Sequence, residues 1–163
     1  MSTDKTAWNA KVLTVSDGVF HGVREDRSGA ALVAMLTESG TWNVVEHRVV
    51  ADGTESVASA LTEMSADFDG LIVTTGGTGF GPRDLTPEGT LSVLERTAPG
   101  LAEATRNVNA PLGRLSRGVA GTRGTTLIVN TPGSPKGCIE CLSAVIDALP
   151  HALSLMTGET TIH

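Results

Sequence analysis

The residues whose types and spacing best suit chemistry lie in one glycine-rich segment, which also contains an arginine and an aspartate. It reads TTGGTGFGPRDLTPE over residues 74–88 and follows the apolar run at residues 70–73. Glycines adopt positive φ angles easily and let the backbone approach a ligand closely. Successive backbone N–H groups in such a loop form a concavity that binds anions. The segment therefore predicts a loop that cradles phosphate.

The charged residues of this segment indicate which kind of phosphate it would hold. Arg83 offers a bidentate cationic contact, and Thr86 is predicted to cap a helix whose N-terminus adds further donors. Asp84 would repel a bare phosphate unless a cation lay between them. Mg²⁺ is typically held by one or two carboxylates together with substrate phosphates. Asp84 therefore predicts a magnesium nucleotide, and Asp52 adds a second carboxylate at the end of another predicted strand.

On these residues alone, a purely structural interpretation of the segment stays open. Glycine loops often only turn the chain, and Asp84 can accept hydrogen bonds from neighbouring backbone N–H groups. The segment is not a P-loop, because G-x-x-x-x-G-K-[ST] is absent, and it does not give G-x-G-x-x-G. An NAD-dependent oxidoreductase would carry that second motif after the first strand, where Ser16-Asp17-Gly18-Val19-Phe20 stands instead.

The elements that must position these residues are strands alternating with helices. This pattern predicts a mostly parallel sheet with helices on both faces, a three-layer α/β/α fold. In such sheets ligands bind at the carboxyl ends of the strands. The predicted strands are residues 11–15, 42–50, 71–74 and 125–130, and the polar segments that follow them are residues 16–29, 51–54, 75–88 and 131–137.

The helices are predicted from apolar residues spaced three and four apart. The first is expected to end at Gly40, and the second to begin with Thr54 as its cap. The last follows the apolar pattern of residues 138–156, and Pro150 should kink or split it. Residues 109–124 are rich in Gly, Pro and Arg and are predicted to be mostly loop.

Length and composition limit the class of protein. A chain of 163 residues with 40% hydrophobic residues is expected to form one domain over residues 1–163, with its core at about residues 10–157. Only residues 12–15 are apolar near the N-terminus, and no run suits a bilayer, so we expect a cytoplasmic protein without membrane contact. A net charge of −6 and 3% aromatic residues argue against a nucleic-acid partner.

The two cysteines, Cys138 and Cys141, form a C-x-x-C pair. Such a pair can be a redox centre or half of a zinc site. No second pair exists, and the four histidines show no ligand spacing. Because the pair lies in an apolar helical pattern, we predict that both thiols pack in the core as small hydrophobic groups. A redox role is the alternative.

Four motifs taken together resemble the MogA/MoaB type of molybdopterin-binding protein. They occur in order over about residues 11–155, and four motifs in register are far more specific than one glycine loop. The motifs are TVSDG and GVREDRSG within residues 14–29, TTGGTGFGPRDLTPE at 74–88, LSRGVAG at 115–121 and NTPGSPKG at 130–137.

The resemblance implies an activity as well as a fold. Members of this family have a three-layer α/β fold and usually assemble as trimers. The implied reaction is adenylation of molybdopterin by ATP with Mg²⁺, which gives adenylyl-molybdopterin and pyrophosphate. The product would then serve a partner protein that inserts molybdenum. The alternative is a protein of the same fold that captures molybdopterin without adenylating it. Loss of Asp84 would favour that alternative, and Asp84 is present.

The resemblance also implies roles for single residues. Asp84 and Asp52 match the family's functional aspartates, with Asp84 as the candidate Mg²⁺ ligand. The remaining matches are Gly76, Gly77, Thr78 and Gly79 in the nucleotide and phosphate loop, Ser16, Asp26 and Ser28 in the first loop, Ser116 and Arg117 in the segment implicated in pterin binding, and Pro132, Gly133, Ser134 and Lys136 in the turn that lines the nucleotide pocket.

Two positions depart from the family pattern. Gly18 stands where many members have an arginine or another polar residue, so Arg24 or Arg27 would have to supply that charge. Asp52 is followed by Gly53, where a second acid is frequent. Asp52-Gly53 therefore does not support two adjacent carboxylates at this position.

Overall fold

A six-stranded sheet in the order β2-β1-β3-β6-β5-β4 forms the centre of the molecule. A computed structural model describes residues 7–108 and 111–159. β2, β1, β3 and β6 run parallel, whereas β5 is antiparallel to β6 and β4 is antiparallel to β5. The strands are β1 Trp8–Val15, β2 Trp42–Val50, β3 Gly70–Thr75, β4 Arg96–Thr97, β5 Ala120–Arg123 and β6 Thr126–Thr131.

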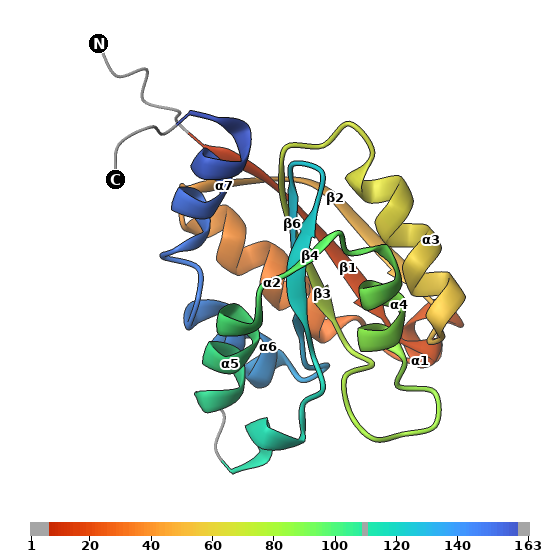
Figure 1. Cartoon of the computed structure of the whole chain (residues 1–163). Helices are drawn as coiled ribbons and strands as arrows, with labels where there is room; N and C mark the ends of the chain where they lie inside the picture. The colour runs from red at the N-terminus through yellow and green to blue at the C-terminus, as the bar shows by residue number, and fades with distance from the viewer. Residues whose placement is uncertain (1–6, 109–110, 160–163) are drawn as a thin grey trace.

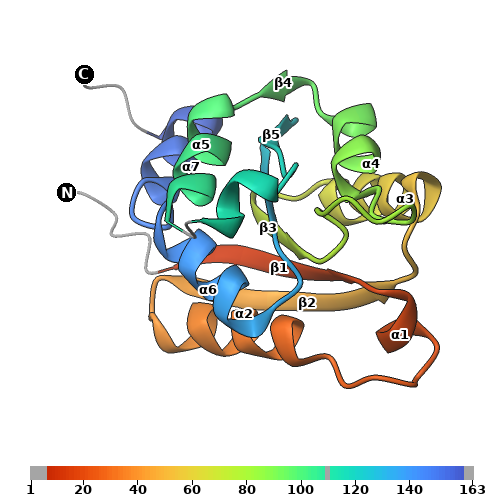
Figure 2. The ribbon, with the colours of Figure 1, turned by 90° about the horizontal axis from the view of Figure 1, so that it is seen from below.

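Helices cover both faces of this sheet, which confirms the predicted three-layer fold. Figures 1 and 2 show α3 and α4 together on one side, with α2, α5, α6 and α7 on the other. The helices are α1 Asp17–Phe20, α2 Arg27–Glu38, α3 Thr54–Ser65, α4 Thr86–Val93, α5 Pro99–Asn107, the 3-10 helix η1 Leu112–Leu115, α6 Pro135–Ser143 and α7 Leu149–Thr157.

Two apolar clusters hold the layers together, and the central strands contribute to both. In β3, Leu71 and Val73 belong to the cluster under α2, α6 and α7, while Ile72 belongs to the cluster under α3. This alternation follows from the two-residue period of a strand. All residues of β3 and β6 are buried, as expected for parallel strands covered on both faces.

The predicted helix ends are partly confirmed. Gly40, with φ of 73°, follows the end of α2, and Pro150 is the second residue of α7, which is separate from α6. The two predicted threonine caps are wrong by one residue. The N-cap of α3 is Gly53 instead of Thr54, and its φ of 134° is one that glycine adopts easily. The N-cap of α4 is Leu85 instead of Thr86, whose hydroxyl donates to the Gly76 carbonyl at 2.9 Å.

The expectation of mostly loop over residues 109–124 is wrong for β5. This strand reads AGTR, which has no apolar alternation, and it forms by pairing with the apolar strand β6. β4, which is two residues long, was likewise not predicted and pairs with β5. Residues 109 and 110 lie outside the described part of the chain. Tertiary pairing therefore creates the two strands that local sequence did not indicate.

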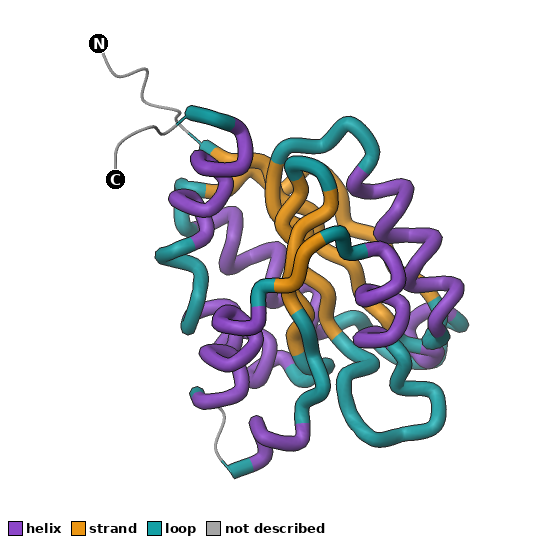
Figure 3. The backbone as a smooth tube through the Cα atoms, in the orientation of Figure 1, coloured by secondary structure: helices purple, strands orange, loops and turns teal. Residues whose placement is uncertain are grey.

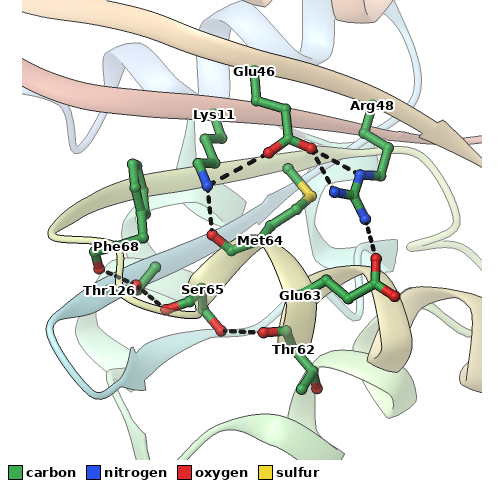
Figure 4. A network of polar contacts seen from close by, with 9 residues as sticks. All are labelled: Lys11, Glu46, Arg48, Thr62, Glu63, Met64, Ser65, Phe68 and Thr126. Carbon is green, nitrogen blue, oxygen red and sulfur yellow. Dashed lines mark hydrogen bonds and ion pairs between the residues drawn. The ribbon is translucent and has the colours of Figure 1, made fainter.

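A chain of alternating charges joins β1 and β2 to α3 and its C-terminal end (Figure 4). Lys11 Nζ lies 3.4 Å from Glu46 Oε1 and donates to the Met64 carbonyl at 2.8 Å. Arg48 contacts Glu46 at 2.7 Å and Glu63 at 2.6 Å. Each cation in this charge chain has a carboxylate partner.

None of the helices within residues 7–108 and 111–159 has the length and apolar character needed to cross a bilayer.

Candidate functional site

The carboxyl ends of the four parallel strands lie at one edge of the sheet, and the loops that follow them line two adjoining pockets. The long loop between β3 and α4 is visible below the sheet in Figure 1 and in teal in Figure 3. The predicted gathering of the polar segments at one edge is therefore confirmed.

The first pocket has a volume of about 460 Å³, and polar and apolar groups contribute about equally to its wall. Arg24 and Arg27 both line it, so both arginines that were considered for the first loop are available to a bound anion. The predicted site residues in its wall are Ser16, Asp26, Ser28, Asp52, Gly76, Gly77, Asp84 and Gly133.

The second pocket, of about 490 Å³, has a more apolar wall. Leu112 and Leu115 come from η1, and Thr105 and Cys141 come from α5 and α6. The predicted site residues in this wall are Gly77, Thr78, Gly79, Asp84, Ser116, Pro132, Gly133 and Ser134.

Three residues line both pockets and so form a shared wall: Gly77, Asp84 and Gly133. Two ligands bound in the two pockets would meet at this wall. Gly133 permits this close arrangement, because a Cβ there would lie 3.3 Å from the Cα of Gly76. The shared wall is therefore where a group could pass from one ligand to the other.

The start of the glycine loop requires glycine at two positions. Gly76 and Gly77 have φ angles of 99° and 69°, which other residues rarely adopt. A Cβ on Gly76 would lie 2.2 Å from the Val15 carbonyl oxygen, and one on Gly77 would lie 2.2 Å from Thr86 Oγ1. The loop is thus packed against β1 and α4, which fixes the wall shared by the pockets.

Asp84 folds back onto its own loop. Its Oδ2 atom accepts a hydrogen bond from the Gly81 backbone N–H at 2.9 Å. Its backbone N–H donates to the Gly81 carbonyl at 3.0 Å. A local turn of this kind was the structural alternative for Asp84, and it holds the carboxylate within the walls of both pockets. The turn and a ligand-binding role are therefore compatible.

Asp52 and Asp17 exchange hydrogen bonds between the loops after β2 and β1. The Asp17 backbone N–H donates to Asp52 Oδ2 at 2.9 Å, and the Asp52 N–H donates to Asp17 Oδ1 at 3.1 Å. Arg83 then pairs with Asp17, from Nε to Oδ2 at 2.6 Å and from Nη2 to Oδ1 at 3.1 Å. The bidentate contact predicted for Arg83 therefore goes to Asp17 in this structure.

The pKa values of Asp17 and Asp52 are shifted in opposite directions. The hydrogen bond from Arg83 lowers the pKa of Asp17. Burial raises the pKa of Asp52, and the charges of Asp17 and Asp84 act in the same direction, although the hydrogen bond from the Asp17 backbone and the charge of Arg83 oppose them. The ionised form of Asp52 is therefore disfavoured in this environment.

The residues present fit a magnesium ion only together with ligand oxygens. Asp52 and Asp84 line the same pocket, and their charges repel each other. Within the described residues there is no group of three or more His, Cys, Asp or Glu side chains arranged to hold a metal. Two carboxylates plus phosphate oxygens is the typical environment of Mg²⁺.

Several predicted residues begin helices. Ser16 Oγ accepts from the Val19 N–H at 3.2 Å, Asp26 Oδ1 accepts from the Gly29 N–H at 2.9 Å, and Ser134 Oγ accepts from the Gly137 N–H at 3.0 Å. These bonds cap α1, α2 and α6. Their contacts with a ligand stay predictions.

Arg117 holds the glycine loop in place. Its Nε donates to the Gly79 carbonyl at 2.8 Å, its Nη2 donates to the Asp84 carbonyl at 2.5 Å, and its Nη1 pairs with Glu88. Ser116, next to it, lines the second pocket. The predicted contact between Arg117 and a substrate stays a prediction, and the guanidinium has a clear role in shaping the loop.

Lys136 lies outside the walls of both pockets. Its side chain is 88% exposed, and its Nζ lies 3.7 Å from Glu140 Oε1, one turn along α6. The predicted contact of Lys136 with an anionic substrate stays a prediction.

The cysteines are free and buried, which confirms their predicted packing in the core. Cys138 Sγ contacts the Pro135 carbonyl, and Cys141 Sγ contacts the Thr105 carbonyl. Burial raises the pKa of both thiols to about 11. Protonated, buried thiols react slowly, so the pair does not suit redox chemistry.

Sequence reasoning missed the apolar wall of the second pocket and the role of Asp17. Leu112 gave no signal, because it lies in a stretch without periodicity, and Leu115 stood at the start of the quoted motif LSRGVAG but was assigned no role. Asp17 stood in the quoted first motif, next to Ser16, but its contact with Arg83 joins residues 66 positions apart. Only the fold brings them together.

Comparison with known proteins gives one consistent family. Residues 11–151 match the family described as "Probable molybdopterin binding domain". Molybdopterin adenylyltransferase from Helicobacter pylori J99 is 40% identical over 153 residues, which cover 90% of this chain and 86% of that protein. The protein of the same name from Escherichia coli K12 is 37% identical, with 90% and 84% covered.

A solved structure agrees with these relatives. The molybdopterin biosynthesis enzyme MoaB from Thermus thermophilus superposes with a TM-score of 0.85 at 46% identity. The match covers 93% of this chain and 97% of that one. Fold and sequence therefore indicate the same family.

Proposed function

The chain belongs to the molybdopterin-binding domain family of MogA/MoaB proteins, and we propose that it catalyses the adenylation of molybdopterin by ATP. The named adenylyltransferases share about two fifths of its residues over nine tenths of its length. The observation that carries the mechanism is the wall of Gly77, Asp84 and Gly133, which two pockets share. A transfer reaction requires two ligands that meet in this way.

We assign ATP to the first pocket and molybdopterin to the second. Arg24 and Arg27 give the first pocket cationic groups for a polyphosphate, and Asp52 and Asp84 give it carboxylates for a metal. The second pocket has an apolar wall, as suits a pterin ring, and ends at the same glycine loop. The terminal phosphate of molybdopterin would then lie at the shared wall.

Asp84 and Asp52 would hold the Mg²⁺ that accompanies ATP. When bound, the ion neutralises negative charge on the phosphates. Asp84 lies at the shared wall, and Asp52 contributes the carboxyl group whose pKa is raised by burial and by its neighbours' charge. Relief of that repulsion by a cation favours binding.

The chemistry forms one bond and breaks one bond. An oxygen of molybdopterin's terminal phosphate attacks the α-phosphorus of ATP, and pyrophosphate leaves with the electron pair of the broken phosphoanhydride bond. A phosphate monoester has a second pKa of about 6 and is largely dianionic at neutral pH. No strong general base is required, so the chain has to align two anions and balance their charge.

The glycine loop supplies much of this alignment. The backbone from Gly76 to Gly79, with the Thr78 hydroxyl, would cradle a phosphate at the shared wall. Thr78 is 5% exposed, so its hydroxyl group lies in a site with little competing water. Arg117 keeps the loop in shape through the Gly79 and Asp84 carbonyls.

The decisive experiment is an adenylation assay with purified protein, molybdopterin, ATP and Mg²⁺, with Asp84→Asn as the variant. Formation of adenylyl-molybdopterin and pyrophosphate by the wild type, with a loss of at least about 100-fold in the variant, supports the proposal. If neither protein forms product although molybdopterin binds, the chain is a molybdopterin-binding protein of the same fold.

Assembly and cellular context complete the proposal. We propose a single-domain subunit, a trimer as implied by the family, and delivery of the adenylate to a molybdenum-insertion protein. ATP as substrate suits the cytoplasm. Sedimentation of the purified protein tests the oligomeric state directly.

A further inference from the structure

Three loops meet at Asp17, although the sequence motifs pointed to other aspartates. Asp17 begins α1 after β1, Asp52 follows β2, and Arg83 lies in the loop after β3. Arg83 Nη2 also donates to the Asp52 backbone carbonyl at 2.9 Å, in addition to its two bonds with Asp17. Asp17 thus receives Arg83 on one side and is bonded to Asp52 on the other.

These contacts place the two carboxylate oxygens of Asp52 in different surroundings. Oδ2 accepts the Asp17 N–H at 2.9 Å and is held in the loop. Oδ1 faces the glycine loop, because a Cβ on Gly77 would lie 3.3 Å from it. The Asp17 backbone N–H therefore sets the direction in which Asp52 presents its second oxygen, and the Asp17 side chain keeps the two loops together by accepting the Asp52 backbone N–H.

We propose that Asp17, clamped by Arg83, is a positioning residue that fixes the Asp52 carboxylate with one oxygen toward the shared wall. The proposal rests on the proposed function, because it gives Asp52 its orientation for that reaction. Asp17 does not touch the reacting atoms in this account and acts through Asp52.

The charges around Asp52 explain why a clamp is needed. Asp52 is surrounded by Asp17 on α1 and by Arg83 and Asp84 in the glycine loop, and the first loop adds Arg24, Glu25, Asp26 and Arg27 to the same pocket. Without a fixed partner, Asp52 would turn away from Asp84, since like charges repel. Arg83 compensates the charge of Asp17, so that Asp17 can stay close to Asp52.

The kinetic test is a double-mutant cycle with Asp17→Ala and Asp52→Asn in the adenylation assay. Asp17→Ala removes the side-chain oxygen that accepts the Asp52 N–H, so it should lower kcat about 10-fold, as loss of a group that orients a ligand does, and change the KM for ATP much less. In the Asp52→Asn background the same change should have less than about a two-fold effect. If the two losses multiply, Asp17 does not act through Asp52 and the proposal is overturned.

Matched variants separate this role from general stabilisation. Arg83→Gln should reproduce the loss of Asp17→Ala. Arg83→Lys should recover part of it, because lysine keeps the positive charge but lacks the two parallel N–H donors of the guanidinium. Glu46→Gln is the control: Glu46 also pairs with an arginine, at 2.7 Å from Arg48, but lies in the charge chain of Figure 4. Its kcat should be unchanged. An equal loss of kcat in Glu46→Gln would contradict a specific role for the clamp.

A second measurement needs no turnover and so separates failure of the clamp from failure of the proposed function. Hydrogen exchange of the Asp52 backbone N–H, followed by NMR, reports the contact directly, because that N–H donates to Asp17 Oδ1 at 3.1 Å. Asp17→Ala should raise its exchange rate about 10-fold or more. An unchanged rate would overturn the clamp even if adenylation occurs. A raised rate would support it even if adenylation is absent.

Discussion

Two groups of charged residues lie at different parts of the same sheet and have opposite charge balance. In the charge chain of Lys11, Glu46, Arg48 and Glu63, each cation contacts at least one carboxylate within 3.4 Å. At the carboxyl edge, Arg83 pairs with Asp17 and donates to the Asp52 carbonyl, and the charge of Asp84 also acts on Asp52. The first group is balanced, and the second has an excess of negative charge.

The difference separates a group that stabilises the fold from one that awaits a ligand. In the balanced group, hydrogen bonds to Glu63 and Glu46 help to raise the pKa of Arg48, although burial opposes them. In the unbalanced group, burial and like charges raise the pKa of Asp52. Functional sites commonly keep such unfavourable charges, which cost stability and favour a bound partner.

The largest expected effect comes from removing one charge of the unbalanced group. Asp52→Asn should lower kcat for adenylation about 30-fold or more, since positioning and charge carry this type of transfer. The same variant should raise Tm by about 2 °C, because it removes an ionised carboxylate whose charge is disfavoured in the folded state. Calorimetry beside the kinetic assay measures both. A Tm that falls by several degrees would show that Asp52 stabilises the fold.

The pH dependence of this stability gain follows from the direction of the pKa shift. Because the folded-state pKa of Asp52 is raised, protonated Asp52 stabilises the fold below the unfolded value of about 3.9, and this contribution is lost as pH rises through the folded pKa. The Tm difference between Asp52→Asn and the wild type should therefore be largest near neutral pH and shrink toward pH 4. A difference that grows as pH falls would contradict the assigned shift.

In the balanced group, we expect the opposite result: a substitution lowers stability moderately and leaves kcat almost unchanged. Glu46→Gln leaves Lys11, whose side chain is 13% exposed, without its carboxylate and deprives Arg48 of one of two partners. Stability should fall by about 1–2 kcal/mol, between the values for exposed and buried pairs, and kcat should stay within about two-fold. Denaturant unfolding measures the first quantity. Loss of activity without loss of stability would remove the distinction between the two groups.

The buried thiols, which are titratable but carry no charge at neutral pH, are expected to affect neither group of charges. With their pKa raised to about 11, Cys138 and Cys141 should react with a disulfide reagent at pH 8 at least about 100-fold more slowly than free cysteine. Unfolding in denaturant should make both react. Fast reaction of the native protein would reopen the redox alternative.

Local patterns were sufficient for the parallel part of the fold. The apolar runs of β1, β3 and β6, the end of α2 near Gly40 and the break between α6 and α7 before Pro150 depend on residues close in sequence, and the sequence predicts them. β5 was not, because its sequence AGTR becomes a strand only beside β6.

In the site, too, some features follow from local sequence and others only from the tertiary structure. Motifs indicated the loops that line the pockets, because strand ends gather in a parallel sheet. They did not indicate that Arg83 would bond Asp17 or that Arg117 would hold the carbonyls of Gly79 and Asp84. Those partners depend on side-chain geometry between segments far apart in sequence, which spacing alone does not encode.

The wall shared by the two pockets has a consequence for what happens after the reaction. Adenylyl-molybdopterin is one molecule made of the two groups that the pockets hold separately, so it would bind as a bivalent ligand. Once one end is held, the other is present at a high effective concentration near its own pocket. Both ends must leave together for the product to escape. The subunit would thus store its own product and keep it from water until an acceptor withdraws it.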